Sequence, residues 1–196
     1  MSYSLHISNV VSRISRFVGT FHCLRVIVPK SVLTMLYSSF VLPHILLHIE
    51  IWGAAPEVHI SRLNIKMNKL LRAILGVSYV NGRPTMDTTI MYNQMGILKL
   101  NNVYKLRLYN LLVNLLSGLL PDLYEMLLGP YLTAHNYSTR QRIFRNPFVS
   151  CEVERRAVAY QLVRLYNDIP SQYINTNGNS LKRMMKKFKQ HVFSEQ

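Results

Sequence analysis

The carboxylates of this chain are too scattered to build a centre for metal-dependent phosphoryl transfer. Such a centre needs carboxylates that hold two Mg²⁺ ions roughly 3.5–4 Å apart, to activate the attacking oxygen and stabilise the leaving one. The aspartates stand apart in the sequence, as Asp87, Asp122 and Asp168. The closest acidic pair, Glu152 and Glu154, is followed by Arg155 and Arg156, which predicts local ion pairing. We therefore predict no catalytic residue in this chain, and neither polymerase nor nuclease activity by the chain alone.

Two histidines have a spacing that can serve metal binding. His44 and His48 are four residues apart, which places both on one face of a helix. No carboxylate completes a His-Glu-x-x-His pattern and Cys23 is a remote third ligand, so packed or capping histidines are the favoured interpretation. We predict no metal site and no cofactor in this chain. Cys23 and Cys151 are isolated thiols, which predicts a reducing intracellular location, nuclear or cytoplasmic.

The basic residues are better organised than the acidic ones. Lys and Arg number 23 against 9 Asp and Glu, a formal net charge of +14, which favours polyanionic partners, nucleic acid first and an anionic membrane surface second. Four cations follow one another at helical spacing, on the face away from Leu63 and Leu70; they are Arg62, Lys66, Lys69 and Arg72. Such a stripe can follow a phosphate backbone. The alternative is an ordinary solvated helix face.

A second basic segment combines aromatic and guanidinium side chains. Its candidate nucleic-acid contacts are His135, Tyr137, Arg140, Arg142 and Arg145. Aromatic faces stack on unpaired bases, while the guanidinium group grips phosphate through paired hydrogen bonds. Composition and aromatic content therefore make this segment a candidate for contact with single-stranded nucleic acid.

The last helix expected from the sequence is basic and amphipathic. Its candidate contacts are Lys182, Arg183, Lys186 and Lys187. These surround an apolar face that includes Leu181, Met184, Phe188 and Val192. A helix of this kind can bind RNA, an anionic membrane or calmodulin, or it can dock its apolar face on its own domain.

Apolar residues recur mostly at three- and four-residue spacing and rarely alternate, which predicts an all-α fold. We expect an irregular, thumb-like helical bundle over 1–128, then a basic C-terminal extension over 129–196 made of a loop, a helix, a linker and the terminal amphipathic helix. Helices are expected over 29–42, 44–53, 56–76, 121–129, 154–166 and 181–193, and also over 10–24 (capped by Ser8 or Asn9), 85–96 (capped by Thr85) and 102–116 (capped by Asn102). A loop is expected over 81–84. The most apolar window, 32–52, is interrupted by polar residues and predicts core rather than a transmembrane segment.

Several short strings occur in an order that resembles the C-terminal part of a non-LTR retrotransposon reverse transcriptase of the jockey-like kind. They are Leu36-Tyr-Ser-Ser-Phe-Val-Leu-Pro-His44, Trp52-Gly53, Ile97-Leu-Lys-Leu100 with Tyr104-Lys-Leu-Arg107, His135-Asn-Tyr-Ser-Thr-Arg140, and Tyr160 to Pro170. The last string departs from the family pattern, with Gln161-Leu162 where Arg-Gly is usual and Tyr166 where Trp is usual.

The resemblance implies a helical thumb and C-terminal extension that holds template RNA and nicked target DNA while a palm domain copies one onto the other. The palm and fingers, with a Phe-Ala-Asp-Asp-like motif and its Mg²⁺, are expected N-terminal to Met1. The implied partners are RNA, DNA and that palm and fingers region, with self-association through the apolar surface the palm would cover. Two alternatives stay open: a protein-interaction or membrane-surface module working through Leu181–Val192, and a decayed copy with no selected function.

Overall fold

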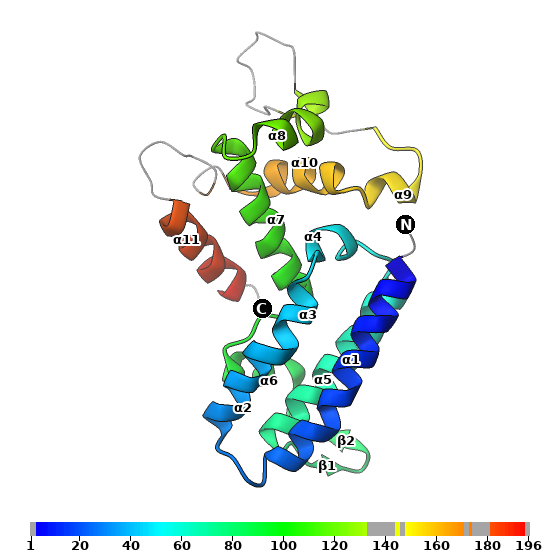
Figure 1. The fold of residues 1–196 in the computed structure, drawn as a ribbon, viewed down its shortest axis with the longest axis vertical. Helices are drawn as coiled ribbons and strands as arrows, with labels where there is room; N and C mark the ends of the chain where they lie inside the picture. The colour runs from blue at the N-terminus through cyan, green and yellow to red at the C-terminus, as the bar shows by residue number, and fades with distance from the viewer. Residues whose placement is uncertain (1–2, 133–143, 146–147, 171–172, 174–180, 195–196) are drawn as a thin grey trace. The chain divides into compact units, whose positions relative to one another are not determined.

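The computed structural model describes residues 3–132, 144–145, 148–170, 173 and 181–194, with the backbone alone over 181–184. Helices dominate these residues, which confirms the all-α class (Figure 1). The chain forms two compact units, one up to Leu100 and one from Asn101 onward. None of the described helices is both long enough and apolar enough to cross a membrane.

Unit 1 is built on two long helices that pack along each other, α1 (Tyr3–Leu24) and α5 (Glu57–Leu75) (Figure 1). Their buried residues recur at three- and four-residue spacing, which lines the apolar side chains on one face of each helix. On α1 they are Ile7, Val10, Val11, Ile14 and Phe21, and on α5 they are Ile60, Leu63, Met67, Leu70, Leu71, Ala73 and Ile74. The apolar face of α1 begins with Ile7, and the helix already includes Ser8 and Asn9, so the predicted cap at those residues was wrong.

A broken helical run connects these two helices. It consists of α2 (Lys30–Leu36), a π-helical turn (Tyr37–Val41), α3 (Leu42–Leu46) and α4 (Ile49–Trp52). The wide turn lies just before Pro43, whose ring and missing N–H are incompatible with an ordinary α-turn at that place. His48 adopts a left-handed backbone with φ 53°, which separates α3 from α4. The buried indole of Trp52 donates from Nε1 to the Leu47 carbonyl at 2.8 Å and so closes the end of α3.

A small hairpin follows α5, where the sequence predicts only a loop. Its strands, β1 (Tyr79–Val80) and β2 (Arg83–Pro84), pair antiparallel. Asn81 and Gly82 both have positive φ, as the tight two-residue hairpin turn requires.

The short helix α6 (Thr88–Met95) follows the hairpin in the chain and packs against α5. Asp87 caps this helix, because its carboxylate accepts the Thr89 backbone N–H at 3.0 Å. Thr85, the predicted cap, instead donates its hydroxyl to the Ser78 carbonyl at the base of the hairpin.

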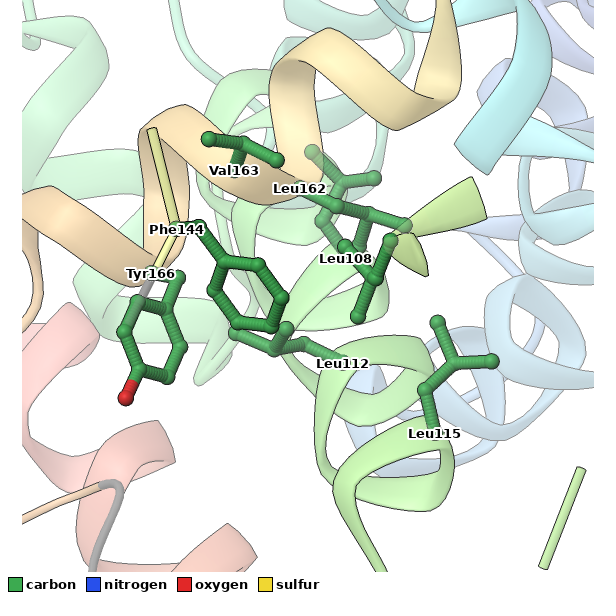
Figure 2. Close-up of a cluster of buried hydrophobic side chains, with 8 residues drawn as sticks. Leu108, Leu112, Leu115, Phe144, Leu162, Val163 and Tyr166 are labelled. Atoms are coloured by element: carbon green, nitrogen blue, oxygen red, sulfur yellow. The ribbon is translucent and has the colours of Figure 1, made fainter. Parts of the chain in front are cut away.

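Unit 2 is organised around α7 (Leu100–Leu116) and α10 (Val158–Asp168). Between them lie α8 (Pro121–Leu127), a 3₁₀ turn (Gly129–Tyr131) and α9 (Glu152–Arg155), and the chain ends with α11 (Leu181–Ser194). Figure 2 shows the core between these elements. It is formed by Leu108, Leu112, Leu115, Leu128, Phe144, Leu162, Val163 and Tyr166.

The core of unit 2 joins both sides of the boundary expected near Gly129. Leu112 on α7 and Leu128 lie before that point, while Phe144 and Tyr166 lie after it, and all four belong to one cluster. The rings of Phe144 and Tyr166 meet edge to face, with centroids 4.8 Å apart. The two compact units meet between Leu100 and Asn101, at the start of α7.

Gly76 ends α5 in a left-handed conformation, with φ 67°, which is strained for a residue that carries a side chain. We predict that Gly76→Ala lowers the free energy of unfolding by about 1 kcal/mol. Gly19, inside α1 with open space around it, is the matched control, and Gly19→Ala should raise stability by roughly 0.5–1 kcal/mol. Urea unfolding followed by circular dichroism measures both changes in the free energy of unfolding. If both variants change it by the same amount in the same direction, the prediction is contradicted.

Candidate nucleic-acid interface

The basic stripe of α5 lies on the outer side of unit 1. Arg62 and Lys69 are exposed, while Lys66 and Arg72 are half-buried. Exposed apolar side chains, Val58 and Ile65, share that surface with them. Within the described part of the chain, none of these four cations forms an ion pair. Arg62 and Lys69 therefore carry positive charge that no neighbouring carboxylate offsets.

Arg72 differs from the other three cations of the stripe. It lies close enough to Tyr92 of α6 for its charge to favour the ionised phenol, although burial is the larger effect and raises the pKa of Tyr92 to about 12. The Nε of Arg72 is buried and has no hydrogen-bond partner among the described residues. Arg72 is thus partly enclosed by the packing of α5 against α6, and it is less available to a ligand than Arg62 or Lys69.

The second basic segment is described only at its end. His135, Tyr137, Arg140 and Arg142 lie outside the described residues. Arg145 is exposed, and its backbone N–H donates to the Tyr131 carbonyl at 2.7 Å. Its neighbour Phe144 is fully buried and forms a β-bridge with Leu132. Arg145 is therefore held at the surface of unit 2 by a residue anchored in its core.

The terminal helix α11 carries exposed cations and a docked apolar face. Lys186 and Lys187 are exposed, and the side chains of Lys182 and Arg183 lie outside the described residues. Phe188 and Val192 are buried, at 4% and 1% exposure. The Phe188 ring stacks on Tyr109 of α7 with centroids 3.9 Å apart. Phe188 and Val192 thus pack within unit 2, one of the outcomes that the sequence left open.

Two further contacts tie α11 and the preceding segment to α7. The Asn102 amide donates to the Val192 carbonyl at 3.4 Å, so a residue expected to cap α7 instead lies inside that helix and binds α11. The Tyr109 hydroxyl donates to the Tyr173 carbonyl at 2.7 Å. Burial raises the pKa of Tyr109 to about 12, with the neighbouring Tyr173 adding to the effect.

An aromatic groove borders α11, and sequence reasoning did not find it. Its wall is formed by Tyr173 and His191, whose rings are stacked with centroids 5.1 Å apart and planes inclined by 18°. Lys187, Gln190 and Ser194 complete the lining. The spacing of Lys187, Gln190, His191 and Ser194 along one helix face is a signal in the sequence. Tyr173 comes from outside the helix, so spacing alone could not include it.

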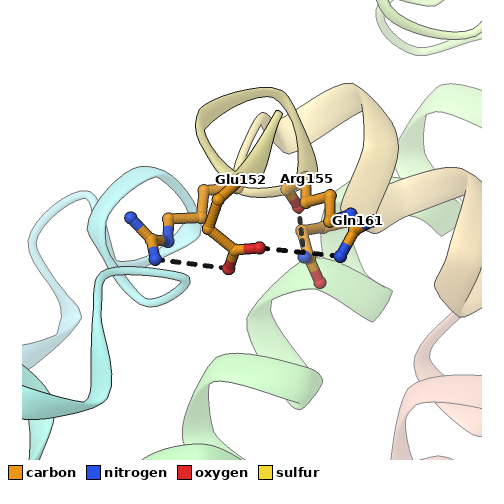
Figure 3. A network of polar contacts seen from close by, with 4 residues as sticks. Glu152, Arg155 and Gln161 are labelled. Carbon is orange, nitrogen blue, oxygen red and sulfur yellow. Dashed lines mark hydrogen bonds and ion pairs between the residues drawn. The ribbon is translucent and has the colours of Figure 1, made fainter. Parts of the chain in front are cut away.

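The acidic residues near α9 serve the local structure. Glu152 forms ion pairs with two arginines, Arg156 at 3.2 Å and Arg155 at 3.7 Å. Figure 3 shows Glu152 beside Arg155. This confirms the predicted local ion pairing for Glu152. Gln161 of α10 donates to the Arg155 carbonyl at 2.7 Å, which fixes the junction of the two helices (Figure 3).

His44 and His48, the two histidines with helical spacing, have roles in the local structure. His44 stacks against Phe17, and its Nδ1 lies 3.4 Å from an Nη of Arg13. His48 occupies the left-handed break between α3 and α4, so the two residues do not share one regular helix. Across the described residues, no three His, Cys, Asp or Glu side chains gather as a metal site would require.

Each unit therefore presents its own basic surface. In unit 1 the candidate cations are Arg62, Lys66 and Lys69 on α5, and in unit 2 the exposed ones are Arg145 and, separately on α11, Lys186 and Lys187. Comparison of the chain with protein-family models, curated proteins and solved structures finds no match.

Tyr109→Phe removes the hydrogen bond to the Tyr173 carbonyl and keeps the ring that stacks on Phe188. We predict a loss of about 0.5–1.5 kcal/mol in the free energy of unfolding at pH 7. Because the pKa of Tyr109 is raised in the folded state, its contribution is complete below pH 10 and is lost as the pH rises towards 12.

The variant should accordingly lose stability less steeply than the wild type between pH 10 and pH 12. The difference in slope should reach at most about 1.4 kcal/mol per pH unit for this one group. Urea unfolding at a series of pH values measures it, and parallel curves for the two proteins would contradict the assignment.

Proposed function

We propose that this chain binds single-stranded RNA and DNA as the thumb-like C-terminal region of a non-LTR retrotransposon reverse transcriptase, and that it is non-catalytic by itself. The ordered sequence strings and the net charge of +14 support the proposal. The observation that carries it is the exposure of Arg62 and Lys69 on α5, neither of which forms an ion pair with any residue that the structure describes. The all-α fold agrees with a thumb, but many unrelated proteins share that class.

The proposed contact works through phosphate rather than through bases. Cations three or four residues apart stand side by side on a helix, so Arg62, Lys66 and Lys69 present a row of positive charge. A nucleic-acid strand laid along that row would release its condensed counterions, which is the main source of sequence-independent affinity. Such contacts fix position and orientation and carry no sequence information. This is the role expected of a region that holds template and target for a palm domain.

The membrane-surface alternative has less support from the geometry of α11. Its apolar face would have to enter the lipid, but Phe188 and Val192 are buried within unit 2 and the Phe188 ring stacks on Tyr109. Membrane insertion would therefore require the helix to leave α7 and give up that packing. The exposed lysines of α11 stay accessible without any such rearrangement.

Binding to a short unstructured RNA should depend steeply on salt. If about five phosphates are neutralised, log K falls with log[salt] at a slope of roughly −3.5, at about −0.7 per contact. The double variant Arg62→Gln/Lys69→Gln should bind more weakly, with a slope reduced in magnitude by about 1.4. Fluorescence anisotropy between low and physiological ionic strength gives both slopes.

The control removes the same charge from arginines that already have partners. Arg155 and Arg164 are paired with Glu152 and Asp168, so Arg155→Gln/Arg164→Gln should change the slope by less than about 0.5. If the affinity of the wild type for RNA does not change with salt concentration, the proposal is contradicted. Equal effects of the two double variants would show that only net charge matters and would remove α5 from the interface.

Exposed apolar side chains in unit 1 favour self-association or contact with a further domain. Among them are Val26 and Ile27, adjacent in the turn after α1 and 82% and 78% exposed. We predict that the wild type associates at micromolar concentration in analytical ultracentrifugation, and that Val26→Ser/Ile27→Ser shifts it towards monomer. Val153→Ser, at an exposed site in unit 2, is the control. A monomeric wild type would contradict this prediction.

A further inference from the structure

The groove beside α11 is an open one whose volume falls within the range of small-ligand sites. Its volume is about 370 Å³, and it is lined by Tyr173, Lys187, Gln190, His191 and Ser194. Ligand pockets begin at roughly 300 Å³, so the space suits one small ligand rather than an extended one. All of the lining belongs to unit 2.

The aromatic wall of the groove is held in place by ring contacts and by a hydrogen bond within unit 2. The Tyr173 ring stacks on the His191 ring and meets the Phe188 ring edge to face, with the Tyr173 and Phe188 centroids 5.8 Å apart. The Phe188 ring in turn stacks on Tyr109. The hydrogen bond from Tyr109 to the Tyr173 carbonyl fixes the same residue through its backbone. On the helix side, the Ser194 hydroxyl donates to the His191 carbonyl at 2.6 Å. The wall is therefore positioned by side chains of α7 and α11 before any ligand arrives.

The polar groups of the groove match the parts of a nucleotide. Lys187 supplies a cation for phosphate, and none of the five lining residues is acidic. Gln190 offers an amide that can both donate to and accept from the edge of a base. The Tyr173 and His191 rings offer flat surfaces to a base or sugar. A phosphate ion alone would leave the aromatic wall unused, and an apolar ligand would leave Lys187 and Gln190 unpaired.

We propose that this groove binds one unpaired nucleotide of a single-stranded nucleic acid, with Lys187 at the phosphate, Gln190 at the base edge and the Tyr173–His191 stack against the base or sugar. The proposal rests on the proposed nucleic-acid binding and locates one of its contacts. A free mononucleotide offers the same chemistry, and the experiment separates these two sources.

The test uses a charge change in the groove that leaves the packing intact. Gln190 is exposed, and Gln190→Glu places a carboxylate where the phosphate and base edge would lie. Affinity for a labelled uridine hexanucleotide at low salt should fall on the order of tenfold. Gln94→Glu makes the identical change at an exposed position on α6 of unit 1, and it should cost less than about twofold.

A lysine pair repeats the comparison without adding an acid. Lys186 and Lys187 are neighbours on α11 and both are exposed, but only Lys187 lines the groove. Lys187→Gln should weaken hexanucleotide binding several-fold more than Lys186→Gln does. If the two variants of each pair lose the same affinity for the hexanucleotide, the proposal that the groove binds a nucleotide is overturned. Nucleic-acid binding by α5 would then still stand.

Calorimetry with uridine monophosphate completes the design. If the mononucleotide binds as tightly as the hexanucleotide and with the same loss in Gln190→Glu, the groove is a site for free nucleotides and the strand-binding form of the proposal is overturned. Much weaker mononucleotide binding with the same dependence on Gln190 supports a site within a strand. No binding of either ligand by the wild type at low salt would refute the groove and the proposed function together.

Discussion

The scarcity of carboxylates is the constraint on which the rest of this structure depends. With 23 lysines and arginines against 9 acids, most cations have no partner available and must stay in water. No charged or polar residue is among the buried residues that the structure describes, because an unpaired buried charge is very costly. The lysines and arginines whose side chains the structure describes are accordingly exposed or half-buried. The unbalanced surface repels itself, and a polyanion would relieve that repulsion.

The few acids are also placed where they cannot neutralise the basic helix faces. Most lie at helix starts, where the N-terminal dipole favours negative charge, as with Glu57 at α5 and Asp122 at α8. Asp87 caps α6, and the pKa of its carboxyl is lowered, chiefly by the hydrogen bond from the Thr89 backbone. Glu152 binds arginines of its own turn. The acids thus stabilise helix ends locally, and among the residues that the structure describes, Arg62 and Lys69 of α5 and Lys186 and Lys187 of α11 have no carboxylate partner.

Sequence reasoning anticipated what depends on a single helix and missed what depends on two segments meeting. The spacing of Leu63, Met67 and Leu70 and the stop at Gly76 were enough to place α5 and its basic face. Arg72 departs from that face because α6 brings Tyr92 beside it, a contact that no local pattern contains. The division of the chain depends on Phe144 reaching the core of α7, and the groove depends on Tyr173 reaching His191.

The wide turn at Tyr37–Val41 has a geometric consequence for the segment around it. Leu33, Tyr37, Val41 and Ile45 are all buried, at a strict interval of four residues. An α-helix uses 3.6 residues per turn, so a row of this kind would wind away from the core by about 40° at every step. The π-helical turn uses an extra residue and cancels part of that drift, which keeps the row facing inward on both sides of Pro43. In this stretch the number of residues is therefore more tightly constrained than their identity: exchanging one apolar side chain for another keeps the row aligned, whereas losing or gaining a single residue would turn half of it towards solvent.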